Sequence, residues 1–342
     1  MGRNKKTTSQ EADSTPKTQT SSDDESRIPI SIRLKVWGIQ TIDRLKTPEE
    51  SNRILVLLTA ILGWLTAMVA VQSLITLCMY QFIQWTGHKL EGSWFQDVSV
   101  LVAALSGVLA YLPLLLLPHL KETLWGPGSW WCRPRLNADE DVKSLGKKAR
   151  NAADGDGTSA KTWWSVVLWA AFAAVVSFLL IQAFGFLTRL ITGGDVSSND
   201  SSEGITKILV QLFHGQGALP WAVWVTIFIT AFITPVLEEM LFHGVVTRSL
   251  LESSFAKTPA GESTRMRSSM VCLVGGLLFG VTHLIGVASA PEAWLTLSGM
   301  TVLGWAFGLL DMRFKSVIPS MVSHVLYNCL VLGLMIISTA MM

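Results

Sequence analysis

Seven long hydrophobic runs constrain the fold of this chain more than any other feature of its sequence. A helix needs about 20 apolar residues to cross the roughly 30 Å of hydrocarbon in a bilayer, and most of the runs reach that length. The sequence therefore predicts an all-α fold, a polytopic transmembrane helix bundle of about seven to eight spans. The runs cover approximately 54–83, 97–119, 163–190, 220–250, 268–290, 295–311 and 317–341.

The composition of the chain agrees with a lipid environment and excludes several classes of protein. Half of its 342 residues are hydrophobic, only 15% are charged, and the mean hydropathy is +0.42. A net charge of +2 offers no basic surface for nucleic acid, so no nucleic-acid partner is expected. The four cysteines stand far apart and form no CxxC pair, which argues against a disulfide scaffold and against a thiolate zinc site.

The distribution of polar residues divides the chain into three segments. Residues 1–50 are rich in Ser, Thr, Lys, Asp and Glu and are predicted to be a disordered cytoplasmic tail. Residues 51–191 hold the N-terminal transmembrane helices, interrupted by a polar and basic cytoplasmic loop at 120–162. Residues 192–342 hold the remaining transmembrane helices.

Loops rich in Lys and Arg stay in the cytoplasm, and their positions predict the orientation of the bundle. With seven crossings, the N-terminus lies in the cytoplasm and the C-terminus outside. Residues 206–218 are apolar but too short to span, and a crossing there would change this parity. We expect a multi-pass protein of the cell membrane, or of an endomembrane if the host is eukaryotic, with the lipid bilayer as one partner.

Ionisable groups inside the predicted spans are the candidates for chemistry, because each costs about 2.5–3.5 kcal/mol to place at the centre of a membrane helix. At about 1.5 Å per helical residue, three of the polar groups lie roughly 16 to 22 Å from the cytoplasmic ends of their helices. They therefore share one layer of the membrane, and we expect them to converge on one site. The polar set comprises Glu238, Glu239, His243, His283, His324 and Asn328.

Local spacing strengthens this expectation, because residues four apart occupy one face of a helix. Pro235 precedes the two glutamates; it removes a backbone donor, crowds the carbonyl of Ala231 and predicts a kink that opens the site. Two GxxxG patterns predict close helix approach in the fifth and sixth runs. The pairs four apart are Glu239 with His243, Phe279 with His283, and His324 with Asn328, and the glycine pairs are Gly276 with Gly280 and Gly304 with Gly308.

Three short sequences resemble the ordered motifs EExxxR, FxxxH and HxxxN of the CAAX protease and bacteriocin-processing family, also called Abi proteins. They are EEMLFHG at 238–244, FGVTH at 279–283 and HVLYN at 324–328. The resemblance extends from Pro220 to the C-terminus. It implies that 192–342 is the catalytic bundle of a glutamate-dependent intramembrane protease, related to the type II CAAX prenyl endopeptidases.

The resemblance also implies roles that agree with the chemistry of the residues. Glu238 and His283 would hold and deprotonate a water molecule, while His324 and Asn328 would donate to the oxyanion. Glu239 completes the catalytic set, neither cofactor nor metal is expected, and His243 and Phe279 support the site. The expected substrate is a membrane-anchored protein or peptide, prenylated where the host prenylates proteins.

One position departs from the family pattern, because His243 stands where the motif has arginine. An imidazole balances the charge of Glu239 only when it is protonated. Three alternatives therefore stay open. They are a noncatalytic scaffold or immunity protein of the same family, a zinc metallopeptidase using Glu238, His283 and His324, and a proton-coupled transporter. HExxH and an internal repeat, which would favour the last two, are both absent from the sequence.

Overall fold

The helices observed in the structure correspond one by one to the seven hydrophobic runs. The computed structural model describes residues 48–87, 93–117, 160–192, 219–253, 264–285 and 289–341, with the short pieces 120, 209–210, 256 and 287. All of these residues belong to one compact unit, Arg44–Met342. The predicted tail at 1–50 lies outside the described residues except for its last three positions, and so do nearly all of the loop at 120–162 and of 206–218.

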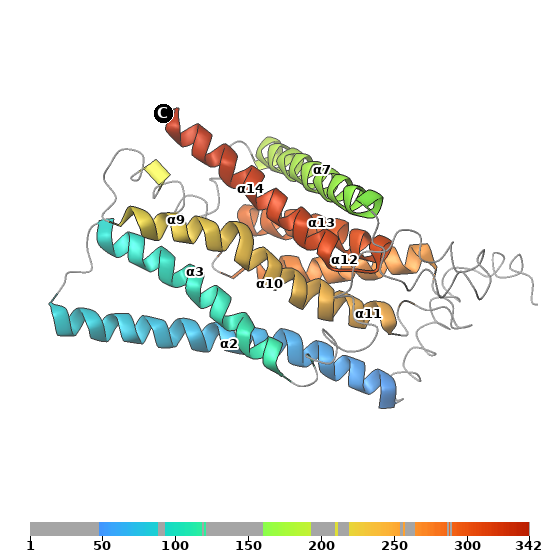
Figure 1. Ribbon diagram of the computed structural model, residues 1–342, viewed down its shortest axis with the longest axis horizontal. Helices are drawn as coiled ribbons and strands as arrows, with labels where there is room; N and C mark the ends of the chain where they lie inside the picture. Colours follow the sequence, from blue (N-terminus) through green and yellow to red (C-terminus); the bar gives the residue numbers. More distant parts are fainter. Residues whose placement is uncertain are drawn as a thin grey trace, which may run out of the picture. The chain divides into compact units, whose positions relative to one another are not determined.

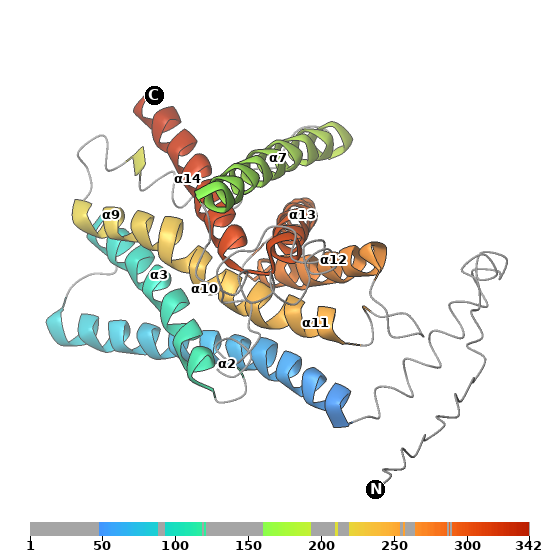
Figure 2. The same ribbon diagram turned by 45° about the vertical axis from the view of Figure 1, so that its right-hand side comes forward.

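The N-terminal half contributes three long helices. They are α2 (Pro48–Thr86), α3 (Ser93–Leu116) and α7 (Ala160–Thr192). Helices α2 and α3 pack against each other, and α7 packs against α13 and α14 of the C-terminal half. Figures 1 and 2 show α2 and α3 on one side of the C-terminal helices and α7 on the other.

The fourth run forms a single continuous helix with two π-helical segments. In chain order it comprises α9 (Pro220–Phe228), η2 (Ile229–Ile233), α10 (Thr234–Leu241), η3 (Phe242–Thr247) and α11 (Arg248–Glu252). Figure 1 shows it as one ribbon between α3 and α14. Single π-helical turns are rare and frequently lie at functional sites, which makes this helix the first place to look for chemistry.

Pro235 affects the helix differently from what the sequence predicts. The expected effect is a lost hydrogen bond at the carbonyl of Ala231, four residues earlier. Instead the preceding turn is π-helical, and the N–H of Thr234 donates to the carbonyl of Ile229, five residues earlier. In this register the residue that would donate to the carbonyl of Thr230 is Pro235, which has no N–H. The carbonyl left without a backbone donor is therefore that of Thr230 rather than that of Ala231.

The last three runs form α12 (Arg265–Thr282), α13 (Ala290–Phe314) and α14 (Ile318–Ala340). Helix α12 ends eight residues before the predicted boundary at 290, because a turn at 283–285 precedes the start of α13. The side chain of Ser289 caps α13 by accepting from the backbone N–H of Glu292. His283 consequently lies at the C-terminal end of α12 rather than inside it.

Helices α12 and α13 approach each other through the predicted glycines. A Cβ atom added at Gly276 would lie 2.5 Å from the carbonyl oxygen of Thr301 and 2.6 Å from the backbone nitrogen of Trp305. One added at Gly304 would lie 2.8 Å from the Cα of Gly276. The prediction that both GxxxG patterns mark close helix contact is therefore confirmed.

The described residues are helical and contain no strand, which confirms the all-α class. Large apolar side chains such as Leu74, Trp164 and Leu168 are exposed on the outward faces of α2 and α7, as a lipid environment requires. In the part of the chain that the structure describes, five helices are long and apolar enough to cross a membrane. They are the long helices α2, α7, α9–α11, α13 and α14, so the predicted count of seven to eight spans is not confirmed.

Candidate active site

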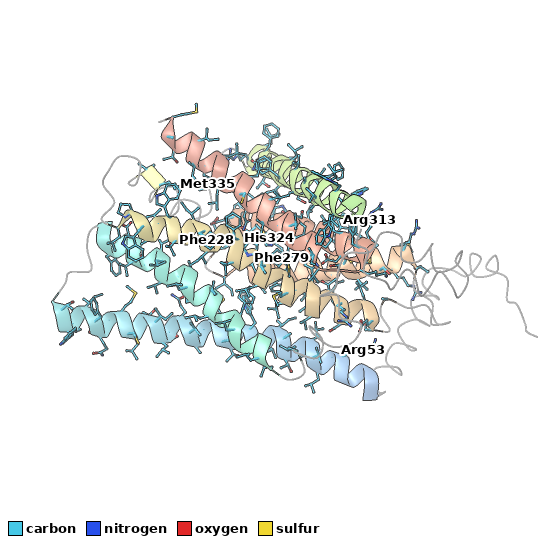
Figure 3. The ribbon with its side chains drawn as sticks, viewed as in Figure 1. Arg53, Phe228, Phe279, Arg313, His324 and Met335 are labelled. Carbon is cyan, nitrogen blue, oxygen red and sulfur yellow. The ribbon has the colours of Figure 1, made fainter. Side chains whose placement is uncertain are left out.

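Two adjacent glutamates of α10 meet a histidine of α14. The Nδ1 atom of His324 lies 2.8 Å from an oxygen of Glu239, and its Nε2 atom lies 3.7 Å from an oxygen of Glu238. Figure 3 shows His324 beside Phe279 where the C-terminal helices come together. Residues 85 positions apart in the sequence thus form the centre of a buried polar cluster.

The cluster continues beyond Glu239 as a chain of alternating carboxylate and imidazole groups. The second oxygen of Glu239 lies 3.6 Å from Nε2 of His243, and Nδ1 of the same ring lies 3.5 Å from Oδ2 of Asp311 on α13. In spatial order the chain runs from Asp311 through His243, Glu239 and His324 to Glu238. We call these five residues the carboxylate–imidazole chain.

Exposure differs sharply between the two ends of this chain. Asp311 and Glu239 are fully buried, and His243 and His324 retain 1% and 4% of their exposure. The side chain of Glu238 keeps 14%. The chain is therefore partly exposed at Glu238, while its Asp311 end is buried.

His283 packs against Phe279 at the end of α12, and its tautomer follows from one contact. Its Nδ1 atom is 2.8 Å from the carbonyl oxygen of Phe279. A carbonyl only accepts, so Nδ1 donates and Nε2 of the neutral ring is left with a lone pair. The ring of Phe279 contacts both histidines, with its centroid 4.5 Å from that of His283 and 6.0 Å from that of His324.

Asn328 occupies the next turn of α14 after His324 and fastens α14 to the first π-helical segment. Its Nδ2 donates to the carbonyl oxygen of Thr230 over 3.0 Å, the carbonyl that Pro235 leaves unserved. The amide nitrogen carries two hydrogens. One remains for a second acceptor.

Aromatic side chains enclose the polar groups, and some come from the N-terminal half. The ring of Phe307 lies 5.3 Å from that of His324, and the ring of Phe242 lies 5.2 Å from that of Phe279. Trp64 of α2 packs edge-on against Phe242 at 5.9 Å. A low-polarity enclosure of this kind strengthens the electrostatic interactions inside it.

Tyr111 of α3 is a further residue of the N-terminal half near the glutamates. Its ring lies 5.7 Å from that of Trp64, and its buried hydroxyl interacts electrostatically with Glu238 and, less strongly, with Glu239. No motif surrounds Tyr111 or Trp64 in the sequence, and neither was predicted as a site residue. Only the packing of α2 and α3 against the fourth helix reveals them.

Four of the six predicted residues form one connected set, and the prediction has one important omission. The contacts join Glu238, Glu239, His243 and His324. The other two predicted residues hydrogen-bond elsewhere, His283 to the carbonyl of Phe279 and Asn328 to that of Thr230. The sequence analysis omitted Asp311, because the sixth run was taken to end there, next to a basic turn. A carboxylate on a predicted membrane helix is the signal that could have identified it.

Three residues of the chain also raise the question of a metal ion. Ligand atoms of Glu239, His243 and Asp311 all lie within 4.8 Å of one another. The two carboxylates, however, face opposite nitrogens of the His243 ring, and a single ion binds only one of these nitrogens. This arrangement suits proton sharing along the ring better than coordination, so we do not assign these residues as metal ligands.

Apolar helices around a buried site of carboxylates and imidazoles are typical of a multi-pass membrane protein with a functional site inside the bundle. Residues 220–330 match the family model of the type II CAAX prenyl endopeptidase Rce1-like proteins. This match confirms the predicted resemblance to the CAAX protease and bacteriocin-processing family for the segment that holds the site. Comparisons with curated proteins and with solved structures find no match.

Proposed function

We propose that this protein is an intramembrane glutamate-dependent endopeptidase. The observation that carries the proposal is the meeting of Glu238 and Glu239 with His324 inside the segment that matches the endopeptidase family. Peptide hydrolysis needs an activated water and donors for the oxyanion, and carboxylate, imidazole and amide side chains can fill these roles.

Glu238 is the proposed general base. Unlike Glu239, which accepts a 2.8 Å hydrogen bond from His324, Glu238 has only a 3.7 Å contact with that ring and is partly exposed. A water held between Glu238 and the free Nε2 of His283 would lose its proton to the carboxylate and attack the peptide carbonyl. When the resulting tetrahedral intermediate collapses, its C–N bond breaks and the proton passes from the carboxyl group to the leaving amine. Because water is the nucleophile, no covalent bond to the enzyme forms.

His324 and Asn328 are the proposed oxyanion donors. Donation of the Nδ1 hydrogen of His324 to Glu239 orients the ring, and its Nε2 must also carry a hydrogen to serve the oxyanion. The carboxylates on both sides favour this doubly protonated ring. The second hydrogen of the Asn328 amide supplies the other donor.

The family resemblance and the membrane setting support a membrane-anchored protein or peptide as the substrate. A prenylated C-terminal peptide and an unprenylated membrane-anchored peptide are the two forms to compare. Both reach the bundle through the bilayer, where a lipid-modified or hydrophobic segment is concentrated.

The decisive test is hydrolysis of these two peptides by the full chain in detergent or vesicles, with Glu238→Gln beside the wild type. We expect the variant to lose about 10²–10⁴-fold in rate, the usual contribution of a general base. Its thermal stability should stay close to that of the wild type, because the amide fits the partly exposed position. Full activity in Glu238→Gln would exclude the carboxylate as base, and a wild type that cleaves neither peptide would favour a noncatalytic member of the family.

A further inference from the structure

Asp311 is a buried acid that the proposed mechanism does not use. It lies on α13, fully buried, and its Oδ1 accepts from the backbone N–H of Ser320 over 3.3 Å. Its Oδ2 faces His243 but has no hydrogen-bond partner. An unpaired carboxylate oxygen with no access to water is costly, so its protonation state needs an explanation.

Four buried atoms without hydrogen-bond partners stand here in two facing pairs. Asp311 Oδ2 faces His243 Nδ1 at 3.5 Å, and His243 Nε2 faces the second oxygen of Glu239 at 3.6 Å. With both carboxylates ionised and the imidazole neutral, one ring nitrogen directs its lone pair at a carboxylate, which is repulsive. One additional proton gives each pair a donor and an acceptor, and thus satisfies all four atoms.

The groups around His243 limit where this additional proton can be held. Among the described residues, the titratable groups that interact with the ring are Glu239 on its own helix, Asp311 on α13 and His324 on α14. Cys272 on α12 adjoins Gly308, as the ring does. Within the described part of the chain, the ion-pair partners of the two carboxylates are imidazoles alone.

Of the two carboxylates, Glu239 is the one better placed to carry the negative charge. It has imidazoles on both sides, and His324 contacts it at 2.8 Å. Asp311 has a single imidazole at 3.5 Å. A neutral acid is the least costly form for a carboxyl group without water, so the proton belongs on Asp311.

We propose that Asp311 is a positioning residue that stays protonated and donates its O–H to His243 Nδ1, so that His243 presents its Nε2–H to Glu239. The two residues together would then take the place of the arginine that the EExxxR motif has at position 243. The inference rests on the proposed function, because the benefit of the pair is to hold Glu239 oriented toward His324. At alkaline pH the proton is lost, His243 no longer has a fixed tautomer, and the rate falls.

The pH profile of hydrolysis by the full chain tests this assignment with Asp311→Asn. The amide keeps an acceptor for Ser320 and offers an N–H to His243 that no base removes. The alkaline limb is the part of the profile where the rate falls as the pH rises. We expect it to shift to higher pH by at least about one unit, the size of shift that one neighbouring charge produces. A profile identical to that of the wild type, or a limb that shifts to lower pH, would overturn the proposal.

Two further variants serve this test, one as a control and one as a replacement for Asp311→Asn. Glu252→Gln is the matched acid-to-amide control, because its side chain is 45% exposed near the end of the same long helix as His243, and its profile should follow that of the wild type. If Asp311→Asn does not fold, His243→Arg replaces it, because a permanent charge beside Glu239 should also shift the alkaline limb to higher pH. Retention of the wild-type limb in His243→Arg would contradict the proposal.

A measurement that needs no activity separates this inference from the proposed function. A folded state that holds a proton released on unfolding becomes less stable as the pH rises. We therefore expect the Tm of the wild type to fall relative to that of Asp311→Asn between about pH 5 and about pH 8, while Glu252→Gln follows the wild type. Parallel Tm curves would defeat the inference and leave the peptidase proposal standing. Stoichiometric metal in the purified wild type, lost in Asp311→Asn, would likewise overturn the proton assignment.

Discussion

Helix α13 makes two contacts of opposite character, and they fail in different ways. Toward α12 it presents Gly304, whose bare backbone touches that of Gly276. Toward the fourth helix it presents Asp311, a buried acid beside His243. The first contact is fixed by the absence of side chains, and the second by polar groups that need partners. The glycine contact should govern stability, and the polar contact should govern activity.

Gly308 connects the two contacts. A Cβ atom there would lie 3.0 Å from the Cβ of Cys272 on α12 and 3.5 Å from Cε1 of His243. The close approach of α12 and α13 therefore leaves just enough room for the imidazole. The small-residue face thus positions the carboxylate–imidazole chain without taking part in its chemistry.

The largest effect on stability should come from Gly276→Ala. The added methyl group would overlap the backbone atoms of Thr301 and Trp305, so the two helices must separate, at a cost of about 1–3 kcal/mol or more. The check is the Tm of the purified variant. Gly333→Ala on α14 is the matched control, since its Cβ would meet nothing within 4 Å. Equal Tm values for the two variants would break the distinction between the contacts.

Asn328→Ala should reduce activity strongly and stability only moderately. Loss of an oxyanion donor costs about 10²–10³-fold in kcat, whereas the lost hydrogen bond to Thr230 is worth about 1 kcal/mol. Measurement of kcat and Tm on the same preparation separates the two effects. Cys329→Ala, at the next position, is the control. A loss of activity that merely follows the loss of Tm would reduce Asn328 to a packing residue.

These outcomes bear on how far the sequence alone could predict the molecule. Helices and glycine contacts were predictable because apolar runs and the GxxxG spacing are local patterns. Asp311 was missed although it lies in a predicted run, because the residues after it include Arg313 and Lys315, which resemble a solvated turn. The helix continues to Phe314, and the guanidinium of Arg313 instead lies 4.5 Å above the ring of Trp169 on α7. Burial of this kind depends on packing between distant segments.

His243→Arg should have a smaller effect, confined to the pH dependence. The guanidinium keeps its charge at all accessible pH values, so the pairing with Glu239 no longer depends on the proton that Asp311 holds. We expect an intact fold and a range of activity that extends further into alkaline pH, as measured by kcat/KM across the pH range. Cε1 of His243 lies 3.5 Å from the position that a Cβ atom at Gly308 would occupy, which leaves limited room for the longer side chain of arginine. An unfolded variant would show that this position accepts imidazole for steric reasons.

Pro235→Ala should have the smallest effect on activity and stability. It tests whether the backbone carbonyl of Thr230 positions Asn328. Alanine restores an N–H that can donate to Thr230 in the π-helical register, where it would compete with the amide of Asn328. The exchange replaces one hydrogen bond by another, so we expect a change in stability within about 1 kcal/mol and a decrease in kcat smaller than that of Asn328→Ala.

Pro319→Ala is the control, because Pro319 lies in the first turn of α14, where a missing N–H removes no hydrogen bond. Equal kcat values in the two variants would show that the carbonyl of Thr230 does not set the position of Asn328. A decrease in kcat for Pro235→Ala alone, at unchanged Tm, would show that the proline holds this carbonyl open for the site.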